Sequence, residues 1–254
     1  MSRILKVLTY NIQVAMESHS IRHYIMHLWH HLLPHPRRES NLELIAQIIK
    51  PFDVVALQEL DGGSIRSRYV NQVDYLSERG DFPYAEYQTT RVVGPFARHS
   101  KALLSRIPIH NVHHYDLPSK IPGRGITTFC LGDEANPVLI VNVHLSLGKK
   151  ARVNQLQFIA DLIADYQHVI VMGDFNMAPN ELMASPLSKT DLKIVDQEII
   201  LTYPSWKPKK QIDYILLSSS LKLADSGVIP CPNSDHLPLY ANVIMPASNQ
   251  ASAQ

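Results

Sequence analysis

Residues 169–176 read VIVMGDFN, an apolar run followed by glycine and two polar side chains. Four aliphatic residues in a row, ended by a glycine, are typical of a short buried strand. The end of a strand holds a polar group rigidly, and a buried carboxylate is costly unless it is paired or binds a metal. Asp174 and Asn176 are therefore candidate functional residues.

The same arrangement recurs elsewhere in the chain. Residues 4–10 predict a strand that ends at Asn11, residues 54–57 a buried strand followed by Gln58 and Glu59 in a loop, and residues 138–143 a strand that ends at His144. Further polar candidates lie toward the C-terminus: Asp213, Asp235 and His236. Polar side chains from distant strand ends suggest one convergent site at the rim of a sheet.

The remaining pattern predicts an α/β protein. Helices are expected over residues 21–33, 40–49, 65–79 and 149–166, and strands over 101–105, 109–115, 125–131, 212–217, 228–229 and 239–244. Ser40 and Glu43 have the spacing of a capping box. Strand, helix and strand lead first to Glu59 and later to Asp174, which suggests two similar layers packed face to face.

Bulk properties exclude several classes of protein. The chain has 254 residues, 45% hydrophobic and 19% charged, without a linker, so we expect one domain over residues 1–246 and a disordered tail over 247–254. A net charge of +1 provides no global basic field. The two cysteines form no CxxC, and no signal peptide or spanning segment is recognisable, so we expect a cytoplasmic monomer.

The candidate residue types suit one kind of chemistry. Oxygen ligands from Glu59, Asp235 and the Asn11 amide favour a hard cation such as Mg²⁺ or Mn²⁺, and the lack of nearby thiolates makes zinc a poorer fit. Histidines among carboxylates can be held protonated, and imidazolium stabilises charge on a phosphoryl centre. A carboxylate such as Asp174 can position and deprotonate a water molecule.

Six segments, in this order, resemble the endonuclease/exonuclease/phosphatase superfamily, and the resemblance covers essentially the whole chain. The segments are residues 8–11 (LTYN), 56–59 (ALQE), 143–145 (VHL), 173–176 (GDFN), 212–215 (IDYI) and 234–238 (SDHLP). GDFN and SDH together, with an upstream Gln-Glu, form a specific combination, whereas any one segment alone is weak.

The resemblance implies a four-layer α/β/β/α sandwich of two mixed, mainly antiparallel sheets, with the site at one edge. It implies metal ligation by Glu59, assisted by Asn11, with Asp235 beside the metal. The other roles that it implies are activation of water by Asp174, a phosphate contact from Asn176, transition-state stabilisation by His236, orientation of His236 by Asp213, and a second imidazole from His144. Water would attack phosphorus in line.

Two departures from the resemblance are visible. Abasic-site nucleases have Asn-x-Asp at the first motif and a tyrosine at the His144 position, whereas this chain has Asn11-Ile12-Gln13. Deoxyribonuclease-like members have a glutamate, just before the strand at 101–105, that pairs with the second imidazole. Here residues 98–101 read RHSK, so the sequence does not identify a partner for His144.

Each candidate also has a structural alternative. Asn11, Asp174 and Asp235 can each cap a turn or helix, although the joint pattern favours a site. Arg124, Trp206 and Lys209 are candidate substrate-binding residues; basic loops at 149–152 and 207–210 can grip an anion, or can simply be solvated surface. Histidines at 19, 23, 27 and 31 have helical spacing, for which we favour a polar helix face over a metal site.

The leading hypothesis is a Mg²⁺-dependent phosphodiesterase of the nuclease type, with nucleic acid as its expected partner and no protein partner implied. The alternatives are a lipid phosphodiesterase or phosphoinositide phosphatase acting on a membrane lipid, and a binding protein that kept the fold without catalysis. The discriminating feature is whether the surface around Arg124, Trp206 and Lys209 forms a long basic cleft or a closed pocket.

Overall fold

The computed structural model describes residues 3–16, 34–119, 123–195, 198–231 and 233–245. The expected helix over 21–33, with its histidines, and the expected tail over 247–254 lie outside these ranges. Within the described residues no helix is long and apolar enough to span a bilayer.

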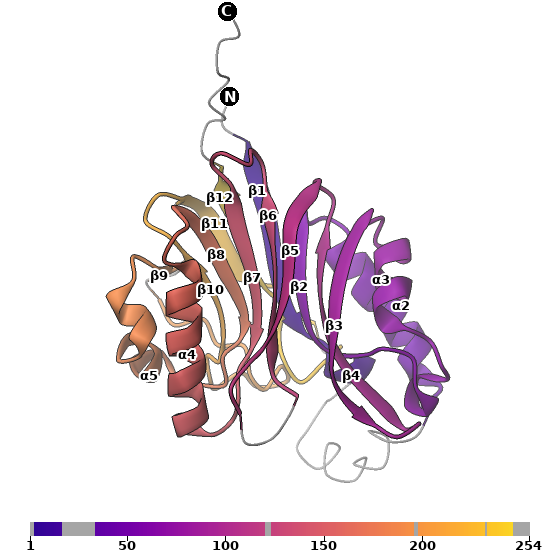
Figure 1. The fold of residues 1–254 in the computed structure, drawn as a ribbon. Coiled ribbons are helices and arrows are strands. Elements are labelled where there is room, and N and C mark those ends of the chain that lie inside the picture. The colour runs from indigo at the N-terminus through magenta and orange to yellow at the C-terminus, as the bar shows by residue number, and fades with distance from the viewer. Residues whose placement is uncertain (1–2, 17–33, 120–122, 196–197, 232, 246–254) are drawn as a thin grey trace, which may run out of the picture.

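Two six-stranded sheets pack face to face, with helices on both outer faces (Figure 1). The first sheet has the order β11 (Lys222–Val228), β12 (Leu239–Ile244), β1 (Ile4–Asn11), β2 (Val54–Asp61), β4 (Ala97–Ser105) and β3 (Tyr84–Val93). The second has the order β5 (Ile109–Asp116), β6 (Gly125–Leu131), β7 (Val138–His144), β8 (His168–Asp174), β10 (Asp213–Leu217) and β9 (Lys193–Ile194). The predicted α/β/β/α sandwich is confirmed.

The two sheets repeat one topology. Each has a single parallel pair among its described strands, β1–β2 and β7–β8, and the other pairs are antiparallel. Helix α2 (Arg37–Ile49) connects the first parallel pair and α4 (Lys149–Ile163) connects the second. The expected similarity between the two halves is therefore present, and the carboxyl ends of both parallel pairs lie at one edge.

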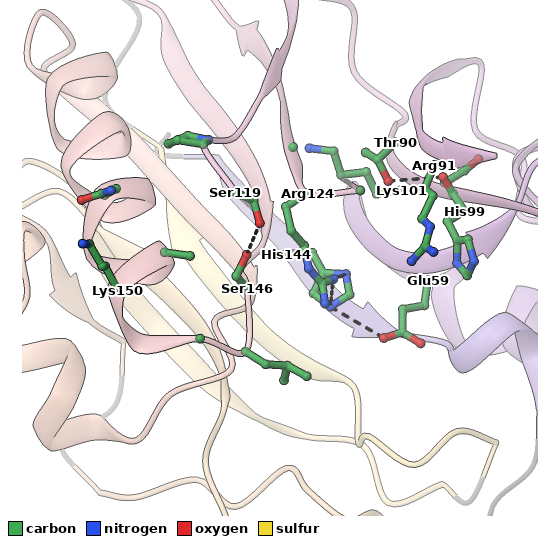
Figure 2. Close-up of a pocket in the computed structure, with 18 residues that line it drawn as sticks. Glu59, Thr90, Arg91, His99, Lys101, Ser119, Arg124, His144, Ser146 and Lys150 are labelled. Atoms are coloured by element: carbon green, nitrogen blue, oxygen red, sulfur yellow. Dashed lines mark hydrogen bonds and ion pairs between the residues drawn. The ribbon is translucent and has the colours of Figure 1, made fainter. Parts of the chain in front are cut away.

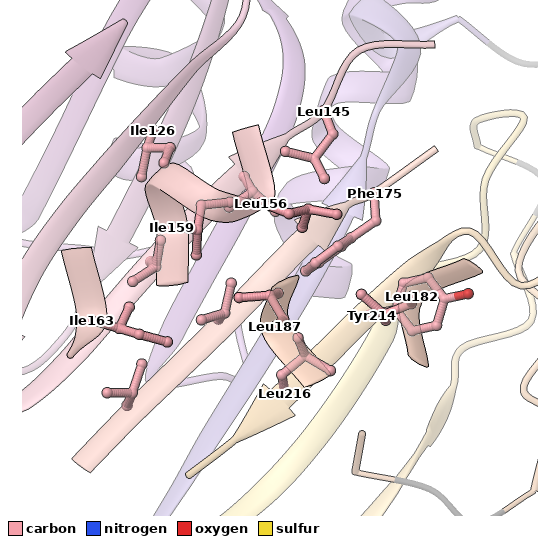
Figure 3. Packing of buried hydrophobic residues seen from close by; sticks show 14 of the residues in the cluster. Ile126, Leu145, Leu156, Ile159, Ile163, Phe175, Leu182, Leu187, Tyr214 and Leu216 are labelled. Atoms are coloured by element: carbon pink, nitrogen blue, oxygen red, sulfur yellow. The ribbon is translucent and has the colours of Figure 1, made fainter. Parts of the chain in front are cut away.

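Three hydrophobic clusters separate the four layers. One lies between the sheets, one beneath α2 and α3 (Gln72–Arg79), and one beneath α4 and α5 (Pro179–Met183). Figure 3 shows the last of these, where Leu156 and Ile159 of α4 pack over the second sheet beside Phe175. The rings of Phe175 and Tyr214 meet edge to face at 5.3 Å, so the residue between Asp174 and Asn176 is anchored in the core.

Local predictions near the first sheet need correction. Helix α2 begins at Arg37 rather than at a Ser40 cap: the Ser40 hydroxyl donates to the Arg37 carbonyl, and Glu43 accepts from the Tyr75 hydroxyl. The predicted capping box of Ser40 and Glu43 is therefore wrong, because the helix has already begun at Arg37 and the Glu43 carboxylate bonds to Tyr75 of α3.

The helix expected over 65–79 is also wrong in part. It consists of a 3-10 turn, Ile65–Ser67, and α3, which begins after Asn71. Arg68 and Tyr69 between them have φ values of +54° and +64°, so the helix cannot be continuous there. Strand β2 likewise continues past Leu57 through a register shift, so Glu59 lies within the strand rather than in a loop. Strands β3 and β9 were not predicted, and β11 was expected only at residues 228–229.

Candidate active site

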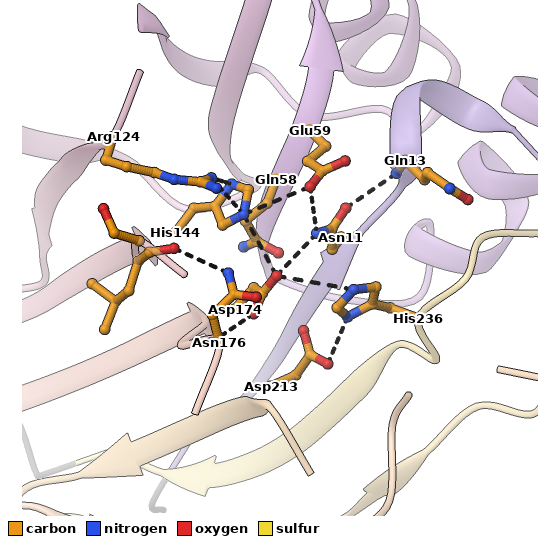
Figure 4. Close-up of polar contacts among 12 residues, drawn as sticks. Asn11, Gln13, Gln58, Glu59, Arg124, His144, Asp174, Asn176, Asp213 and His236 are labelled. Atoms are coloured by element: carbon orange, nitrogen blue, oxygen red, sulfur yellow. Dashed lines mark hydrogen bonds and ion pairs between the residues drawn. The ribbon is translucent and has the colours of Figure 1, made fainter. Parts of the chain in front are cut away.

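The predicted site residues converge where the two parallel pairs end (Figure 4). In the first sheet Asn11 pairs with Gln58, next to Glu59. In the second sheet His144 pairs with Asp174, which in turn pairs with Asp213 at the start of β10. The packing of one sheet on the other therefore brings five of the predicted side chains to one edge.

Gly173 sets the position of Asp174. Its φ is +149°, and a Cβ atom there would lie 2.0 Å from the Val143 carbonyl oxygen of the neighbouring strand. Such a distance is far inside van der Waals contact, so β7 and β8 can approach this closely only with glycine. The close approach holds the Asp174 carboxylate directly beside His144.

Glu59 has a strained backbone. Its φ is +55°, and it lies within the register shift of β2 between Leu57 and Leu60. A left-handed conformation is unfavourable for a glutamate and persists where the surrounding structure fixes it, often at functional sites. The bulge leaves the Glu59 side chain 36% exposed at the sheet edge, whereas that of Asp174 is only 2% exposed.

The Asn11 amide joins the acids of the two sheets. Its Nδ2 donates to Glu59 Oε1 at 3.2 Å and to Asp174 Oδ2 at 3.1 Å. Its Oδ1 accepts the backbone N–H of Gln13 at 3.1 Å. The amide nitrogen therefore faces the carboxylates, and Asn11 holds Glu59 and Asp174 in place.

Asp213 and His236 form a buried pair. His236 Nδ1 lies 2.8 Å from Asp213 Oδ2, which also accepts the Thr202 hydroxyl at 2.5 Å. Burial by itself lowers the pKa of His236, but the charge and hydrogen bond of Asp213, with the charges of Asp174 and Asp235, raise it well above the ordinary value. His236 is therefore an imidazolium at neutral pH, as expected from the sequence.

His144 differs from that expectation. Arg124 Nη1 lies 2.8 Å from His144 Nδ1 and 2.7 Å from Nε2, so the guanidinium donates to the ring. Burial first, and then the charges of Arg124 and His236, lower the pKa of His144 well below the ordinary value. The prediction of a protonated histidine is wrong here, and Arg124 carries the positive charge on this side of the site. An arginine is thus the partner of His144 that the sequence did not identify.

Asp174 lies between the two histidines. Its Oδ2 is 3.5 Å from His144 Nε2 and 3.9 Å from His236 Nε2, while its Oδ1 accepts the Asn176 backbone N–H at 2.9 Å. Burial raises the pKa of Asp174 to about 7, although the His236 charge opposes that rise. The carboxyl group therefore exchanges protons close to neutral pH. The Asn176 amide donates to the Leu145 carbonyl at 3.0 Å, which fixes its orientation.

Asp235 is a third buried carboxyl group at this edge. It accepts the Ser234 hydroxyl at 3.3 Å, and burial raises its pKa to about 6, with Glu59 adding to the rise. Asp213 Oδ1 is buried and has no hydrogen-bond partner among the described residues. Asp174, Asp213 and His236 place one ligand atom each within 4.8 Å of one another, so this buried cluster can hold a metal ion.

The donor set fits a hard cation. Four carboxylates, Glu59, Asp174, Asp213 and Asp235, gather near two cationic side chains, His236 and Arg124. Since His236 Nδ1 and Thr202 already occupy one Asp213 oxygen, we regard that pair as an orienting contact. The carboxylates of Glu59, Asp174 and Asp235 then remain, and such oxygen atoms are the ligands that a hard cation prefers.

A cavity of about 780 Å³ adjoins the site on the His144 side (Figure 2). Glu59, Arg124 and His144 of the site line it, and so do Lys150 of α4 and Arg91 of β3. Trp206 and Lys209 do not line it. They lie in the segment 203–210, which is joined to the other side of the site because Ser205 N donates to the Asp235 carbonyl at 2.8 Å. Of the three predicted substrate-binding residues, Arg124 alone therefore lines this cavity.

Comparison with known proteins identifies the family. The Endonuclease/Exonuclease/phosphatase family model matches residues 8–236, and the chain belongs to this family. Its members hydrolyse phosphoester bonds. A search of curated protein sequences found no match to this chain.

Several solved structures share the fold. An endonuclease/exonuclease/phosphatase from Beutenbergia cavernae aligns with a TM-score of 0.74 at 19% identity, covering 96% of this chain and 72% of the other. A mannosyl-6-phosphatase from Bacteroides thetaiotaomicron aligns with a TM-score of 0.70 at 21% identity, covering 95% and 100%. Truncated TDP2 from Caenorhabditis elegans aligns with a TM-score of 0.70 at 16% identity, covering 95% and 98%.

Proposed function

We propose that this protein is a divalent-metal-dependent phosphoester hydrolase in which Asp174 activates the attacking water. The observation that supports this most directly is the buried Asp174 carboxylate, fixed beside Asn11 and 3.9 Å from the imidazolium of His236. A base with a pKa near the working pH can take a proton from water and still return it efficiently.

The reaction needs two groups besides the base. Water transfers a proton to Asp174 as its oxygen bonds to phosphorus, and the bond from phosphorus to the leaving oxygen breaks. The His236 imidazolium, oriented by Asp213, stabilises the negative charge that develops on the phosphoryl oxygens, and Arg124 does so from the His144 side. Asn176 is proposed to hold a phosphate oxygen.

Glu59 and Asp235 are the proposed metal ligands, with Asn11 positioning Glu59. When bound, Mg²⁺ or Mn²⁺ supplies Lewis-acid polarisation of a phosphoryl oxygen. This assignment uses the more exposed carboxylate, Glu59, at the mouth of the site and leaves the deeply buried Asp174 for proton transfer.

A generic ester tests the proposal without assuming the natural substrate. Bis(4-nitrophenyl) phosphate and 4-nitrophenyl phosphate present a diester and a monoester with the same leaving group. We expect hydrolysis of at least one with Mg²⁺ or Mn²⁺, loss of activity with chelator, and recovery when the metal is restored. Activity that is unchanged by chelator would contradict the metal assignment, and the absence of activity on both esters with either metal would contradict the catalytic one.

Compact phosphoesters are the proposed substrates, because the binding space beside Glu59 and His144 is a cavity of limited volume. Nucleic acid remains the second candidate, for a specific reason. The loop with Trp206 and Lys209 is attached beside Asp235, and the Tyr203 ring lies 5.0 Å from that of His236, so a strand could contact this loop. Screening sugar phosphates, DNA, RNA and phospholipids with the same metal distinguishes these classes.

A further inference from the structure

The cavity beside the site is strongly cationic. Four lysine or arginine side chains line it, Arg91, Lys101, Arg124 and Lys150, whereas Glu59 is the one acidic residue among its described lining residues. Arg124 and Glu59 belong to the reaction centre described above. The other three cations have no role in the proposed hydrolysis.

Lys101 is the most unusual of these residues (Figure 2). It lies on β4, is 3% exposed, and its Nζ is buried without a hydrogen-bond partner among the described residues. Burial lowers the pKa of this amine well below its ordinary value, and the charge of Asp116 opposes that shift only in part. An amine that is buried without a partner is costly to protonate, and an anionic ligand would supply the partner that favours the charged form.

The position of Lys101 relates the cavity to catalysis. It lines the same cavity as Glu59, Arg124 and His144 of the reaction centre. Arg91, on the neighbouring strand β3, and Lys150, on α4, are both exposed and lie toward solvent. A charged group that entered past Arg91 and Lys150 would therefore find Lys101 at the buried end.

We propose that this cavity binds a second phosphate group of the substrate, with Lys101 as its main contact and Arg91 and Lys150 at the entrance. This inference rests on the proposed hydrolase function and narrows it to small molecules that carry two phosphates. The reacting phosphate lies at Asp174 and His236, and the second occupies the space beyond Arg124. A phosphate oxygen gives the Lys101 ammonium the charge-assisted hydrogen bonds that it otherwise lacks.

Lys101→Met tests the assignment, because methionine keeps much of the length and apolar volume of the lysine stem and removes only the charge. Lys222→Met is the matched control, since Lys222 is exposed on the edge strand β11. Each variant and the wild type are titrated calorimetrically with pyrophosphate in metal-free buffer. They are then assayed with metal on the two nitrophenyl esters and on hexose monophosphate and bisphosphate pairs.

We expect Lys101→Met to weaken pyrophosphate binding by about tenfold or more, since one charge-assisted contact is lost. We also expect it to remove the preference for bisphosphates through KM while leaving the nitrophenyl esters within about twofold. Lys222→Met should behave as wild type. Pyrophosphate affinity that is equal in wild type and Lys101→Met would overturn the proposal, as would an equal loss of activity on every ester.

Two further comparisons complete the test. If the wild type hydrolyses neither nitrophenyl ester, the proposed function fails, and pyrophosphate binding still decides on the cavity by itself. Inositol 1,4-bisphosphate in solution and phosphatidylinositol 4-phosphate in phosphatidylcholine vesicles present related phosphate groups from two sources. If only inositol 1,4-bisphosphate is hydrolysed in a Lys101-dependent way, the substrate is a soluble molecule. If only the phosphatidylinositol 4-phosphate is, the substrate is a lipid headgroup. If both are hydrolysed equally well by wild type and Lys101→Met, the proposal is contradicted.

Discussion

Asp174→Asn is expected to lower kcat by roughly 10³-fold or more, because it removes the base while keeping the size of the side chain. The amide can still occupy the space between Asn11 and the two histidines, so KM should change much less than kcat. Steady-state kinetics on a nitrophenyl ester with saturating Mg²⁺ measures both constants.

The same substitution should stabilise the metal-free protein at alkaline pH. The folded-state pKa of Asp174 is about 7 and its ordinary value is 3.8, so the folded state holds this proton more tightly. Stability from this group is therefore present below pH 4 and is lost as pH rises through 7, where burial of the ionised carboxylate is unfavourable. At pH 8 the Tm of Asp174→Asn should exceed that of wild type, and at pH 4 the difference should disappear.

Asp165→Asn is the control, because Asp165 is an exposed carboxylate that follows α4, away from the site. It should retain both wild-type kcat and wild-type Tm. If Asp174→Asn kept more than about a tenth of the wild-type kcat, Asp174 would not be the base, since removing a general base costs at least about 10²-fold.

The strands that carry the site could be predicted because each follows one rule. Residues 169–172 are apolar and lead through Gly173 to Asp174, and residues 138–143 are apolar except for Asn142 and lead to His144. Both strands prove to be buried along their length. A parallel pair buried on both faces selects such runs, so the sequence pattern and the fold coincide there. The end of β1 at Asn11 follows the same rule.

Strand β3 was missed because it lacks a long apolar run, although six of its ten residues are tyrosine, threonine or valine, which favour strands. Tyr84–Val93 is an edge strand whose residues are all exposed or half-buried, so it has no continuous apolar run. The break in the helix expected over 65–79 was hidden for a related reason. Asp61 accepts hydrogen bonds from Ser64 and Ser67 and pairs with Arg66, and these contacts hold a compact turn that hydrophobic periodicity cannot reveal.

The candidate site shows the same division. The sequence could name Glu59, Asp174 and His236, because their residue types and order resemble those of the family. It could not show that Arg124 contacts His144, since Arg124 precedes β6, His144 ends the neighbouring strand β7, and no local spacing joins the two residues. The sequence showed only that residues 98–101, which include Lys101, contain no acidic residue. That the Lys101 amine is buried without a hydrogen-bond partner among the described residues became clear only from the packed structure.

His236→Gln is expected to lower kcat by roughly 10²- to 10³-fold. His236 is a buried cation whose Nε2 lies 3.9 Å from Asp174 Oδ2. Its loss removes charge stabilisation that is needed mainly in the transition state. KM should change little, and turnover at saturating substrate measures the effect. His113→Gln, which replaces an exposed histidine of β5, should leave kcat unchanged, and a His236→Gln variant with nearly full kcat would exclude this role.

Asp213→Asn tests whether catalysis needs the positive charge of His236, because it keeps the His236 side chain and changes only how readily that side chain is protonated. Asp213 is the strongest of the groups that raise the pKa of His236, while burial acts to lower it, so the pKa of His236 must fall when this carboxylate becomes an amide. The active form is the imidazolium, so activity is lost as pH rises through that pKa. The alkaline limb of the kcat profile should therefore move to lower pH, with a loss at pH 8 that is partly recovered at pH 6. A uniform loss at every pH would mean that Asp213 only supports the local packing, because a structural defect would not shift the limb.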